Sequence, residues 1–484
     1  MNKYIASFVI SAFFMALIFL FAVDAIPRVN PNIVVIMTDD QDDASLEVMT
    51  KTKNLLVDRG IRFLNSFVDY SLCCPSRATL MTGQNAHNHG VYNNKPPEGG
   101  YNKFRPSEGS SLPVWLKHAG YDTAMIGKYL NGYWPPSDGR PTPLPGWDRL
   151  VPFLENCYFN CSYGDNGSVV NFGSSDYSTD VIANKAVEFV MSRANLQKPF
   201  FMWVTPIAPH GSVGGGTGRP EAAPRHRGLF ASLLLPKPPS FNEADVSDKP
   251  FNIRSLPPLD QAKIDSITAV FRARWETILA VDEMVEKIVN ALGKAGKLEN
   301  TVIVFTSDNG WLQGEHRISM GKKIMYEESA RVPLVMKGPG IPAGQIRTQL
   351  VNNVDLSATI LDLAGATPGR ALDGKSVAPL FHNPTTAWRT ALLIQAMYNE
   401  GIQSRFKAVR TNRFLFAEHM YSDGSASEKE LFDLATDPYE LQSRHSDSVY
   451  ASVMASLQNI LSKMKTCAGS SCWITDPEPT FPDH

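Results

Sequence analysis

Short apolar runs that stop abruptly at polar clusters recur along the chain. Three of them, at 32–37 (NIVVIM), 199–205 (PFFMWVT) and 301–306 (TVIVFT), are rich in β-branched and aromatic residues, and a shorter run, TAMI, stands at 123–126. Runs of this length and composition, bounded by turn-forming residues, are typical of buried strands. The sequence therefore predicts at least these strands, each ending beside polar side chains.

Helical periodicity is clearest at 264–292, between two of these runs. One face of this segment carries Ile278, Val281, Val285, Ile288 and Leu292. Buried strands that alternate with amphipathic helices are typical of a parallel sheet covered on both faces. We therefore predict an α/β fold with a doubly wound, mostly parallel sheet flanked by helices.

The pattern changes after about residue 385. Strand-like runs follow at 391–396 (ALLIQA), 405–411 (RFKAVRT) and 412–418 (NRFLFAE), and then a helical stretch at 449–464. This order predicts a large α/β domain over 27–384 and a smaller α+β domain, with a short antiparallel sheet and a helix, over 385–484. The region 206–258 is rich in Pro, Gly and Ser and is expected to form long loops.

The first 25 residues have the pattern of a secretory signal peptide. Lys3 precedes an apolar run from Ile5 to Val23, and Ala25 suits cleavage after it. The run is longer than usual, so an uncleaved single-span anchor is the alternative. Both interpretations place the rest of the chain in the secretory lumen or outside the cell, and no second apolar stretch is long enough to span a bilayer.

Four of the six cysteines form two closely spaced pairs. Cys157 with Cys161, and Cys467 with Cys472, are each expected to form a local disulfide in an oxidising compartment. Two glycosylation sequons, at Asn160 and Asn166, lie close to the first pair and would mark a surface loop in a eukaryotic protein. Cys73 and Cys74 are adjacent, unlike the CxxC spacing of redox or zinc pairs, and need another explanation.

Composition and net charge limit the size of the hydrophobic core and the kind of partner that the protein can bind. The 484 residues, 43% of them hydrophobic, can bury one large core and a smaller one. A net charge of −2 argues against a nucleic-acid partner, because such proteins are usually basic.

Polar side chains follow the predicted strands at their carboxyl ends, where ligands bind in doubly wound sheets. Taken singly, each is explained as a turn former, a helix cap or a solvated loop residue. Together, two oxygen-rich clusters at one edge suit a hard divalent cation. The residues are Asp39, Asp40, Lys128, His210, Asp308 and Asn309.

The segment CCPSRATLMTG at 73–83 suggests a nucleophile beside an anion site. We predict a helix that begins at Pro75, where a missing N–H costs nothing, and ends at Gly83. Cys73 would then lie just ahead of a helix N-terminus, which favours anions, and Arg77 could reach back to the same place. A nucleophile, an anion pocket and a divalent cation together suggest displacement at a phosphate or sulfate ester.

At this point the chain resembles the sulfatase family. CCPSRATLMTG fits the family's Cys-x-Pro-Ser-Arg signature with its Thr-Gly pair, and the similarity continues through IVVIMTDDQ, GKYLNGYW, APH, TSDNGWLQGEH, KKIMYEESARVPLVMKGPG, VDLSATILDLAG and ELFDLATDPYE. HNHGVYNN and GKYLN look most like the branch with N-acetylglucosamine-6-sulfatases, extracellular endosulfatases and fungal or algal arylsulfatases. The resemblance covers nearly the whole chain after the signal and implies an alkaline-phosphatase-like fold with a small C-terminal domain.

The resemblance implies a modified nucleophile. In sulfatases the first cysteine of the signature is oxidised to formylglycine by a formylglycine-generating enzyme, so Cys73 would be the precursor and Cys74 would fill the variable position. One hydroxyl of the aldehyde hydrate attacks sulfur, and the other collapses to expel sulfate. A serine at the same position would remain as a stable sulfate ester.

The resemblance also implies roles for the other site residues. Asp39, Asp40, Asp308 and Asn309 match the family's calcium ligands, completed by the modified Cys73 and the substrate sulfate. Arg77 would hold the formylglycine hydrate, and Asp308 would help to deprotonate it. Lys128 and Lys322 match lysines that bind sulfate oxygens. His210 matches the histidine near the leaving oxygen and, with Lys322, is the candidate general acid.

One position departs from the family pattern. Many sulfatases have a histidine two residues after the lysine that matches Lys128, and here that residue is Leu130. The glucosamine-sulfatase-like branch has the same replacement, so activity is still expected. The base for sulfate elimination is unassigned, with Asn131, His87 and His89 as weak candidates. His316 in GEHR is expected in the second layer of the site or on the substrate side.

The sequence thus predicts a secreted, calcium-dependent sulfuric ester hydrolase acting on a sulfated sugar or an aryl sulfate. A phosphonate or phosphodiester hydrolase of the same superfamily is one alternative, and a sulfated-glycan-binding protein without turnover is another. A net charge near zero favours a monosaccharide end or a small aryl ester over internal sites of a polyanionic chain. No nucleic-acid partner is expected, and no membrane contact beyond the N-terminal signal.

Overall fold

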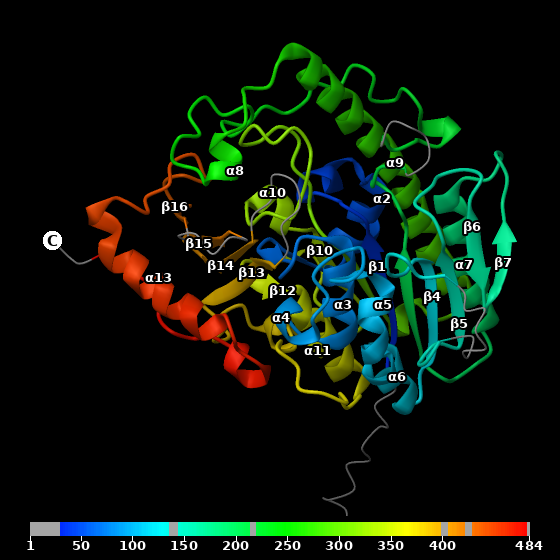
Figure 1. The fold of residues 1–484 in the computed structure, drawn as a ribbon. Helices are drawn as coiled ribbons and strands as arrows, with labels where there is room; N and C mark the ends of the chain where they lie inside the picture. Colours follow the sequence, from blue (N-terminus) through cyan, green and yellow to red (C-terminus); the bar gives the residue numbers. More distant parts are fainter. Residues whose placement is uncertain (1–29, 135–143, 213–218, 398–404, 422–427, 482–484) are drawn as a thin grey trace, which may run out of the picture. The chain divides into compact units, whose positions relative to one another are not determined.

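The computed structural model describes residues 30–134, 144–212, 219–397, 405–421 and 428–481 (Figure 1). The predicted signal peptide at 1–25 lies outside these residues. Among the described helices, none is both long enough and apolar enough to cross a membrane. Residues Pro31–His484 form one unit. The division at 384/385 therefore stays a prediction.

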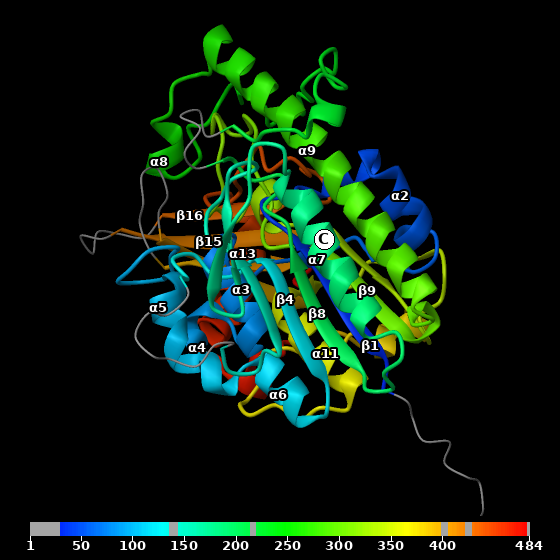
Figure 2. The same cartoon turned by 90° about the vertical axis from the view of Figure 1, so that its right-hand side faces the viewer.

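A ten-stranded sheet forms the centre of the fold (Figure 2). Its central strands β9, β1, β8, β4 and β5 run parallel to one another, as predicted. Antiparallel pairs lie on both sides of this centre: β10 runs antiparallel to β9 and β2, and β6 to β5 and β7, whereas the edge strand β11 is parallel to β2. In spatial order the strands are β11 (Gln345–Arg347), β2 (Ile61–Phe63), β10 (Leu334–Lys337), β9 (Thr301–Ser307), β1 (Asn32–Thr38), β8 (Phe200–Thr205), β4 (Asp122–Lys128), β5 (Arg149–Phe153), β6 (Ser162–Asp165) and β7 (Ser168–Asn171).

Helices cover both faces of this sheet, which explains why its central strands are apolar throughout. Ile33 and Val35 of β1 pack toward α3 (Cys73–Thr82), α6 (Leu112–His118) and α11 (Asn353–Ala364). Val34 and Ile36 pack toward α7 (Ser178–Ser192) and α9 (Gln261–Lys294). Helix α9 is the predicted helix at 264–292, and it starts earlier because the Asp260 side chain accepts a hydrogen bond from the Lys263 N–H (2.8 Å).

The predicted antiparallel sheet near the C-terminus is present and has four strands (Figure 1). They are β13 (Ala391–Ala396), β14 (Arg405–Thr411), β15 (Phe414–Met420) and β16 (Lys429–Asp433), of which the sequence indicated the first three. Helix α13 (Ala451–Met464) packs on one face through Val453 and Leu457. The other face packs against residues near the start of α3, including Tyr70 and Leu72.

The remaining elements are short. Between β8 and α9 the described residues hold only η4 (Pro224–His226) and α8 (Phe251–Arg254), which confirms the long loops expected there. The others are η1 (Asp43–Val48), α2 (Thr50–Thr52), η2 (Lys53–Val57), β3 (Ser66–Phe67), α4 (Ala86–His89), α5 (Gly100–Phe104), η3 (Arg105–Ser110), η5 (Leu298–Asn300), α10 (Glu327–Ala330), β12 (Val351–Asn352), α12 (Pro379–His382), η6 (Ser448–Tyr450) and η7 (Gly469–Cys472).

The cysteines fall into the groups predicted from their spacing. Disulfides join Cys157 to Cys161 and Cys467 to Cys472, whereas Cys73 and Cys74 are free and buried. Asn160 and Asn166, the two sequon asparagines, are exposed beside the first disulfide. Both are therefore on a surface that a glycosylating enzyme could reach.

Candidate active site

The carboxyl ends of four neighbouring strands bring the predicted polar residues to one edge of the sheet. Asp39 and Asp40 follow β1, and Lys128 ends β4. His210 comes five residues after β8 ends at Thr205. The Asp308 N–H donates to the Thr38 carbonyl oxygen (3.1 Å), which aligns the ends of β9 and β1. Parallel pairing therefore assembles the site.

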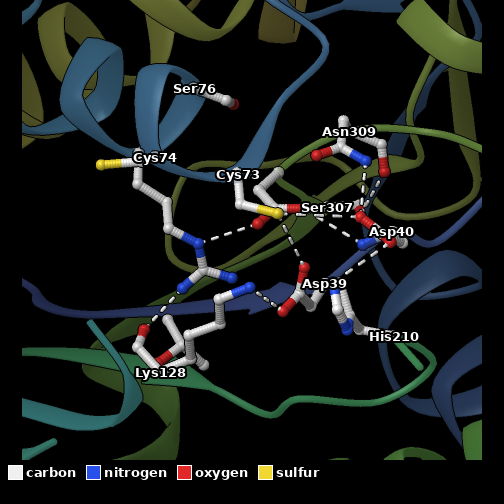
Figure 3. Close-up of polar contacts among 12 residues, drawn as sticks. Asp39, Asp40, Cys73, Cys74, Ser76, Lys128, His210, Ser307 and Asn309 are labelled. Carbon is white, nitrogen blue, oxygen red and sulfur yellow. Dashed lines mark hydrogen bonds and ion pairs between the residues drawn. The ribbon is translucent and has the colours of Figure 1, made fainter. Parts of the chain in front are cut away.

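Helix α3 places Cys73 against this edge (Figure 3). The helix begins at Cys73 and not at Pro75, which corrects the sequence-based start. Leu72 is extended and its carbonyl oxygen accepts from the Ser76 N–H (2.9 Å), so the first helical turn already includes Cys73. Pro75 is tolerated because the N–H groups of the first turn have no partner within the helix. Gly83 ends the helix at φ 65°, as predicted.

The Cys73 sulfur lies between carboxylates and an ammonium group. Its Sγ is 3.3 Å from Asp39 Oδ1 and 3.9 Å from Asp40 Oδ1, and Lys322 Nζ is 2.9 Å from it. The residue is fully buried. Burial and the charge of Asp39 raise the pKa of the Cys73 thiol to about 12. As encoded, Cys73 is therefore a neutral thiol and a poor nucleophile at neutral pH.

Each carboxylate of this site is paired with a cation. Lys128 contacts Asp39, Lys322 contacts Asp40, and Arg77 Nε lies 2.8 Å from Asp308 Oδ2. We call these residues, with Cys73, the Cys73 cluster. Burial opposes ionisation of Asp39 and Asp40, but the neighbouring cations outweigh burial and hold both pKa values below the usual range. Lys128 is the strongest of these cations at Asp39, and Lys322 is the strongest at Asp40.

The donor set fits a hard divalent cation. Asp40 Oδ2 and Asn309 Oδ1 are buried oxygens without a hydrogen-bond partner among the described residues. Ligand atoms of Asp39, Asp40, Cys73 and His210 all lie within 4.8 Å of one another. Buried acceptors without a donor are costly unless a cation occupies the space that they face. Burial and the charge of Asp39 also raise the pKa of Asp308 to about 6. The electrostatic environment of Asp308 therefore favours additional positive charge.

The side chain of His210 is the part of the site that meets solvent. Its exposed fraction is 20%, against 10% for Lys322, 5% for Lys128 and none for Asp39, Asp40 and Arg77. His210 Nε2 is 3.8 Å from Asp40 Oδ2, and Nδ1 is 2.6 Å from the Gly211 carbonyl oxygen. A substrate would therefore reach residue 73 past His210 and Lys322.

The sequence-based candidates for the elimination base do not join this site. His87 bonds the Cys467 carbonyl oxygen (2.9 Å), and His89 bonds Thr79 (3.1 Å). Asn131 makes no side-chain hydrogen bond to the Cys73 cluster in the described part of the chain. Leu130 is buried in the core. His316 is fully buried beside Glu243 (2.7 Å), so it cannot lie on the substrate side.

One supporting residue was missed by the sequence analysis. Arg274 of α9 is buried and donates to the backbone carbonyl oxygens of Asp40 (2.5 Å) and Pro209 (3.4 Å). It thereby ties the segment after β1 to the segment that leads to His210. A signal was present, because Arg274 precedes Ile278 by four residues and so interrupts the apolar face of its helix.

Searches of known proteins agree with this geometry. The chain matches the sulfatase family over residues 31–366 and the C-terminal region of N-sulphoglucosamine sulphohydrolase over 314–467. It is 34% identical to an arylsulfatase of Volvox carteri, with 92% of this chain and 76% of the relative aligned. It is 31% identical to an N-acetylglucosamine-6-sulfatase of Capra hircus, with 94% and 88% aligned.

A solved structure gives the same result at the level of the fold. A protein in complex with its substrate D-glucosamine-2-N,6-O-disulfate superposes with a TM-score of 0.75 at 26% identity, covering 90% of this chain and 97% of its own. The large sheet and the C-terminal sheet together have the alkaline-phosphatase-like arrangement of sulfatases. From these matches, the chain belongs to the sulfatase family, whose members hydrolyse sulfuric esters.

Proposed function

We propose that this sulfatase releases inorganic sulfate from a small sulfated sugar or aryl sulfate, with residue 73 as the nucleophile. The observation that carries the proposal is the position of Cys73. Its Sγ lies in the first turn of α3, 2.9 Å from Lys322 Nζ and 3.3 Å from Asp39 Oδ1. A helix N-terminus and a lysine both favour the sulfate anion at this point.

Residue 73 acts after oxidation to formylglycine. Support comes from the raised pKa of the buried thiol, which would leave an unmodified cysteine unreactive. The hydrated aldehyde supplies a hydroxyl nucleophile and a second hydroxyl that permits release of sulfate. A formylglycine-generating enzyme is thus the required partner during biosynthesis, and it would have to act before folding because Cys73 is fully buried.

Asp39, Asp40, Asp308 and Asn309 would hold the calcium ion, next to residue 73. The proposal is supported by the unpartnered oxygens of Asp40 and Asn309 and by a donor set that consists of oxygens. When bound, calcium supplies Lewis-acid polarisation of a sulfate oxygen. Lys128 and Lys322, which contact Asp39 and Asp40 here, neutralise the negative charge that develops on the sulfate oxygens.

Arg77 and His210 have different tasks in this proposal. Arg77 is fully buried and held by Asp308, and its second terminal nitrogen has no hydrogen-bond partner among the described residues, so it is available to the hydrate of residue 73. His210 is at the open side, and with Lys322 it would give a proton to the leaving alcohol oxygen. Burial lowers the pKa of His210, although Asp39 and Asp40 oppose this effect.

A 6-O-sulfated glucosamine is the first substrate to test. This choice rests on the N-acetylglucosamine-6-sulfatase relative and on the disulfated glucosamine bound by the similar structure. A chain end is the preferred position, because the net charge of −2 offers little attraction to a long polyanion. We further propose that the protein follows the secretory route, since its sequence begins with a signal-like segment and its structure has two disulfides.

The test is a mass spectrum of the tryptic peptide that ends at Arg77, from protein made with and without the formylglycine-generating enzyme. We expect aldehyde at residue 73, and sulfate release from 4-nitrocatechol sulfate, only with the enzyme. Calcium chelation with EGTA should abolish the release and added calcium should restore it. A thiol at residue 73 in fully active protein would contradict the proposal, as would sulfate release that chelation does not affect.

A further inference from the structure

A second group of potential metal ligands lies outside the Cys73 cluster. His316 belongs to the loop after β9, Glu328 to α10 and Glu440 to the loop after β16. One ligand atom of each lies within 4.8 Å of the corresponding atoms of the other two. We call these residues the His316 cluster. It shares no residue with the Cys73 cluster.

Each residue of this cluster has a buried polar atom without a hydrogen-bond partner among the described residues. His316 Nε2, Glu328 Oε2 and Glu440 Oε1 are buried and unpartnered within the described part of the chain. His316 is 0% exposed and Glu440 is 1% exposed. Three unpartnered buried polar atoms on residues that lie so close together are unfavourable unless something binds between them.

The orientation of His316 favours a metal in that position. Its Nδ1 lies 2.7 Å from Glu243 Oε2, and the carboxylate of Glu243 is also held by Lys249 Nζ (3.2 Å). Because a carboxylate only accepts, the hydrogen of the imidazole is on Nδ1, and Nε2 presents a lone pair to Glu328 and Glu440. A histidine oriented by a carboxylate in this way is the usual arrangement around protein-bound metals.

Nearby cations do not neutralise this cluster. Arg331 forms ion pairs with Glu327 and Asp43, and Arg410 with Glu327, and among the described residues no ion pair reaches Glu328 or Glu440. The site lacks positive charge in the absence of a bound cation.

The cluster also has an access route. Glu328 lines a cavity of about 740 Å³, together with Glu315, Glu327, Arg331 and Trp311. His316 and Glu440 are each held at positive φ, 51° and 56°, a conformation that side chains other than glycine rarely adopt. A cation entering through the cavity would meet Glu328 first and then the two buried ligands.

We propose that His316, Glu328 and Glu440 form a second metal site, which binds a divalent transition metal such as Zn²⁺. One imidazole nitrogen with two carboxylate oxygens suits zinc, whereas calcium prefers oxygen ligands alone. The metal would join the loop after β9, α10 and the loop after β16, and so connect the large sheet to the C-terminal sheet. This role is structural and independent of the chemistry at residue 73.

Cobalt binding tests the proposal, because Co²⁺ takes the same ligands as zinc and absorbs visible light. Metal-stripped protein is first saturated with calcium, which fills the oxygen-rich Cys73 cluster, and is then titrated with Co²⁺. We expect saturable binding at a single site per chain. The Glu440→Gln variant should bind at least about 10-fold more weakly, and Glu243→Gln about 10- to 100-fold more weakly, because Glu243 orients the histidine.

A nearby buried glutamate provides the matched control. Glu430 is 0% exposed, and its two oxygens bond Tyr326 (2.7 Å) and His419 (2.6 Å), so neither is left for a metal. Glu430→Gln should therefore bind Co²⁺ like the wild type. Circular dichroism confirms that each variant is folded before its affinity is compared.

Equal cobalt affinity in Glu440→Gln and the wild type would overturn the proposal, as would a loss of binding in Asp40→Asn alone. If Glu440→Gln does not fold, a cobalt-soaked crystal of the wild type decides by anomalous diffraction. A peak within bonding distance of His316 Nε2 supports the site. A peak at the Cys73 cluster alone overturns it.

Discussion

The carboxylates of the Cys73 cluster and those of the His316 cluster differ in how their charge is balanced. In the Cys73 cluster, Lys128, Lys322 and Arg77 each contact an aspartate. In the His316 cluster, no cation pairs with Glu328 or Glu440 among the described residues, and their pKa values are raised by burial. Both groups contain fully or almost fully buried carboxylates, such as Asp40 and Glu440, so burial alone does not decide whether a carboxylate is charged.

The difference indicates what each group can bind. A cluster with its own cations can accept an anionic sulfate together with one metal ion, because the protein's cations and the metal ion both compensate the negative charge of the substrate. A cluster of acceptors without cations can accept only positive charge. The first is therefore suited to catalysis on an anion, and the second to holding a metal.

The largest effect is expected from Cys73→Ser, which tests the reactive residue of the Cys73 cluster. A serine can attack once but cannot release sulfate, so turnover should fall by about 10⁵-fold or more. The sulfated serine should accumulate, and mass spectrometry of the tryptic peptide that ends at Arg77 would detect it. Repeated turnover by this variant would contradict the role of formylglycine.

Removal of one cation should make the Cys73 cluster resemble the His316 cluster. Lys322→Met removes the ammonium that lies 2.9 Å from Cys73 Sγ, and kcat should fall by about 10²- to 10³-fold. In EGTA the free energy of unfolding should also fall, by about 3–5 kcal/mol, because Asp40 loses its buried partner. With calcium bound the loss should be smaller, since the ion compensates Asp40.

Urea denaturation of Lys322→Met with and without calcium measures this difference. Lys117→Met is the control, because Lys117 pairs with Asp148 at the surface and its side chain is 46% exposed. An equal loss of stability in both conditions would mean that calcium does not bind next to Asp40.

The central part of the fold and most of the Cys73 cluster could be predicted from the sequence for a simple reason. The apolar runs of β1, β8 and β9 are local patterns, and parallel pairing brings their polar ends together whatever the intervening segments do. The antiparallel edges could not be predicted in this way. β10 and β6 have only four residues each, too few to show a clear pattern, and β10 also pairs with β2, which is distant in sequence.

The errors at the site also have physical causes. The start of α3 was predicted at Pro75, two residues too late. Proline is compatible with every position of the first helical turn and so does not mark the first residue of the helix. His316 was expected in the second layer of the site or on the substrate side, and the second of these is wrong because the residue is fully buried. Its burial depends on Glu243, which comes from the long loop region at 206–258 and whose position no local pattern reveals.

A smaller effect is expected at Arg274, the residue that holds the backbone of the Cys73 cluster. Arg274→Met removes the donor to the carbonyl oxygens of Asp40 and Pro209, so the free energy of unfolding should fall by about 2–4 kcal/mol. We expect kcat to fall about 10-fold, because Asp40 and His210 would be less well positioned.

Arg272→Met is the matched control for Arg274 on the same helix. Arg272 is half-buried and donates to the carbonyl oxygen of Leu233 (2.8 Å), a residue that belongs to neither cluster. Its replacement should lower the free energy of unfolding by about 1 kcal/mol and leave kcat unchanged. If both variants lose activity equally, Arg274 has no special role in positioning the site.

The smallest effect is expected at Cys74, which is as buried as Cys73 but belongs to neither cluster. Its side chain points away from Asp39 and Asp40 in Figure 3 and packs in the hydrophobic core, while its N–H donates to Asn94 Oδ1 (2.9 Å). Cys74→Ala keeps that backbone bond and removes only the sulfur. Unfolding free energy should fall by about 1 kcal/mol, and kcat should stay within about twofold of the wild-type value. A tenfold loss of sulfate release, with aldehyde still formed at residue 73, would show that the second cysteine takes part in the reaction.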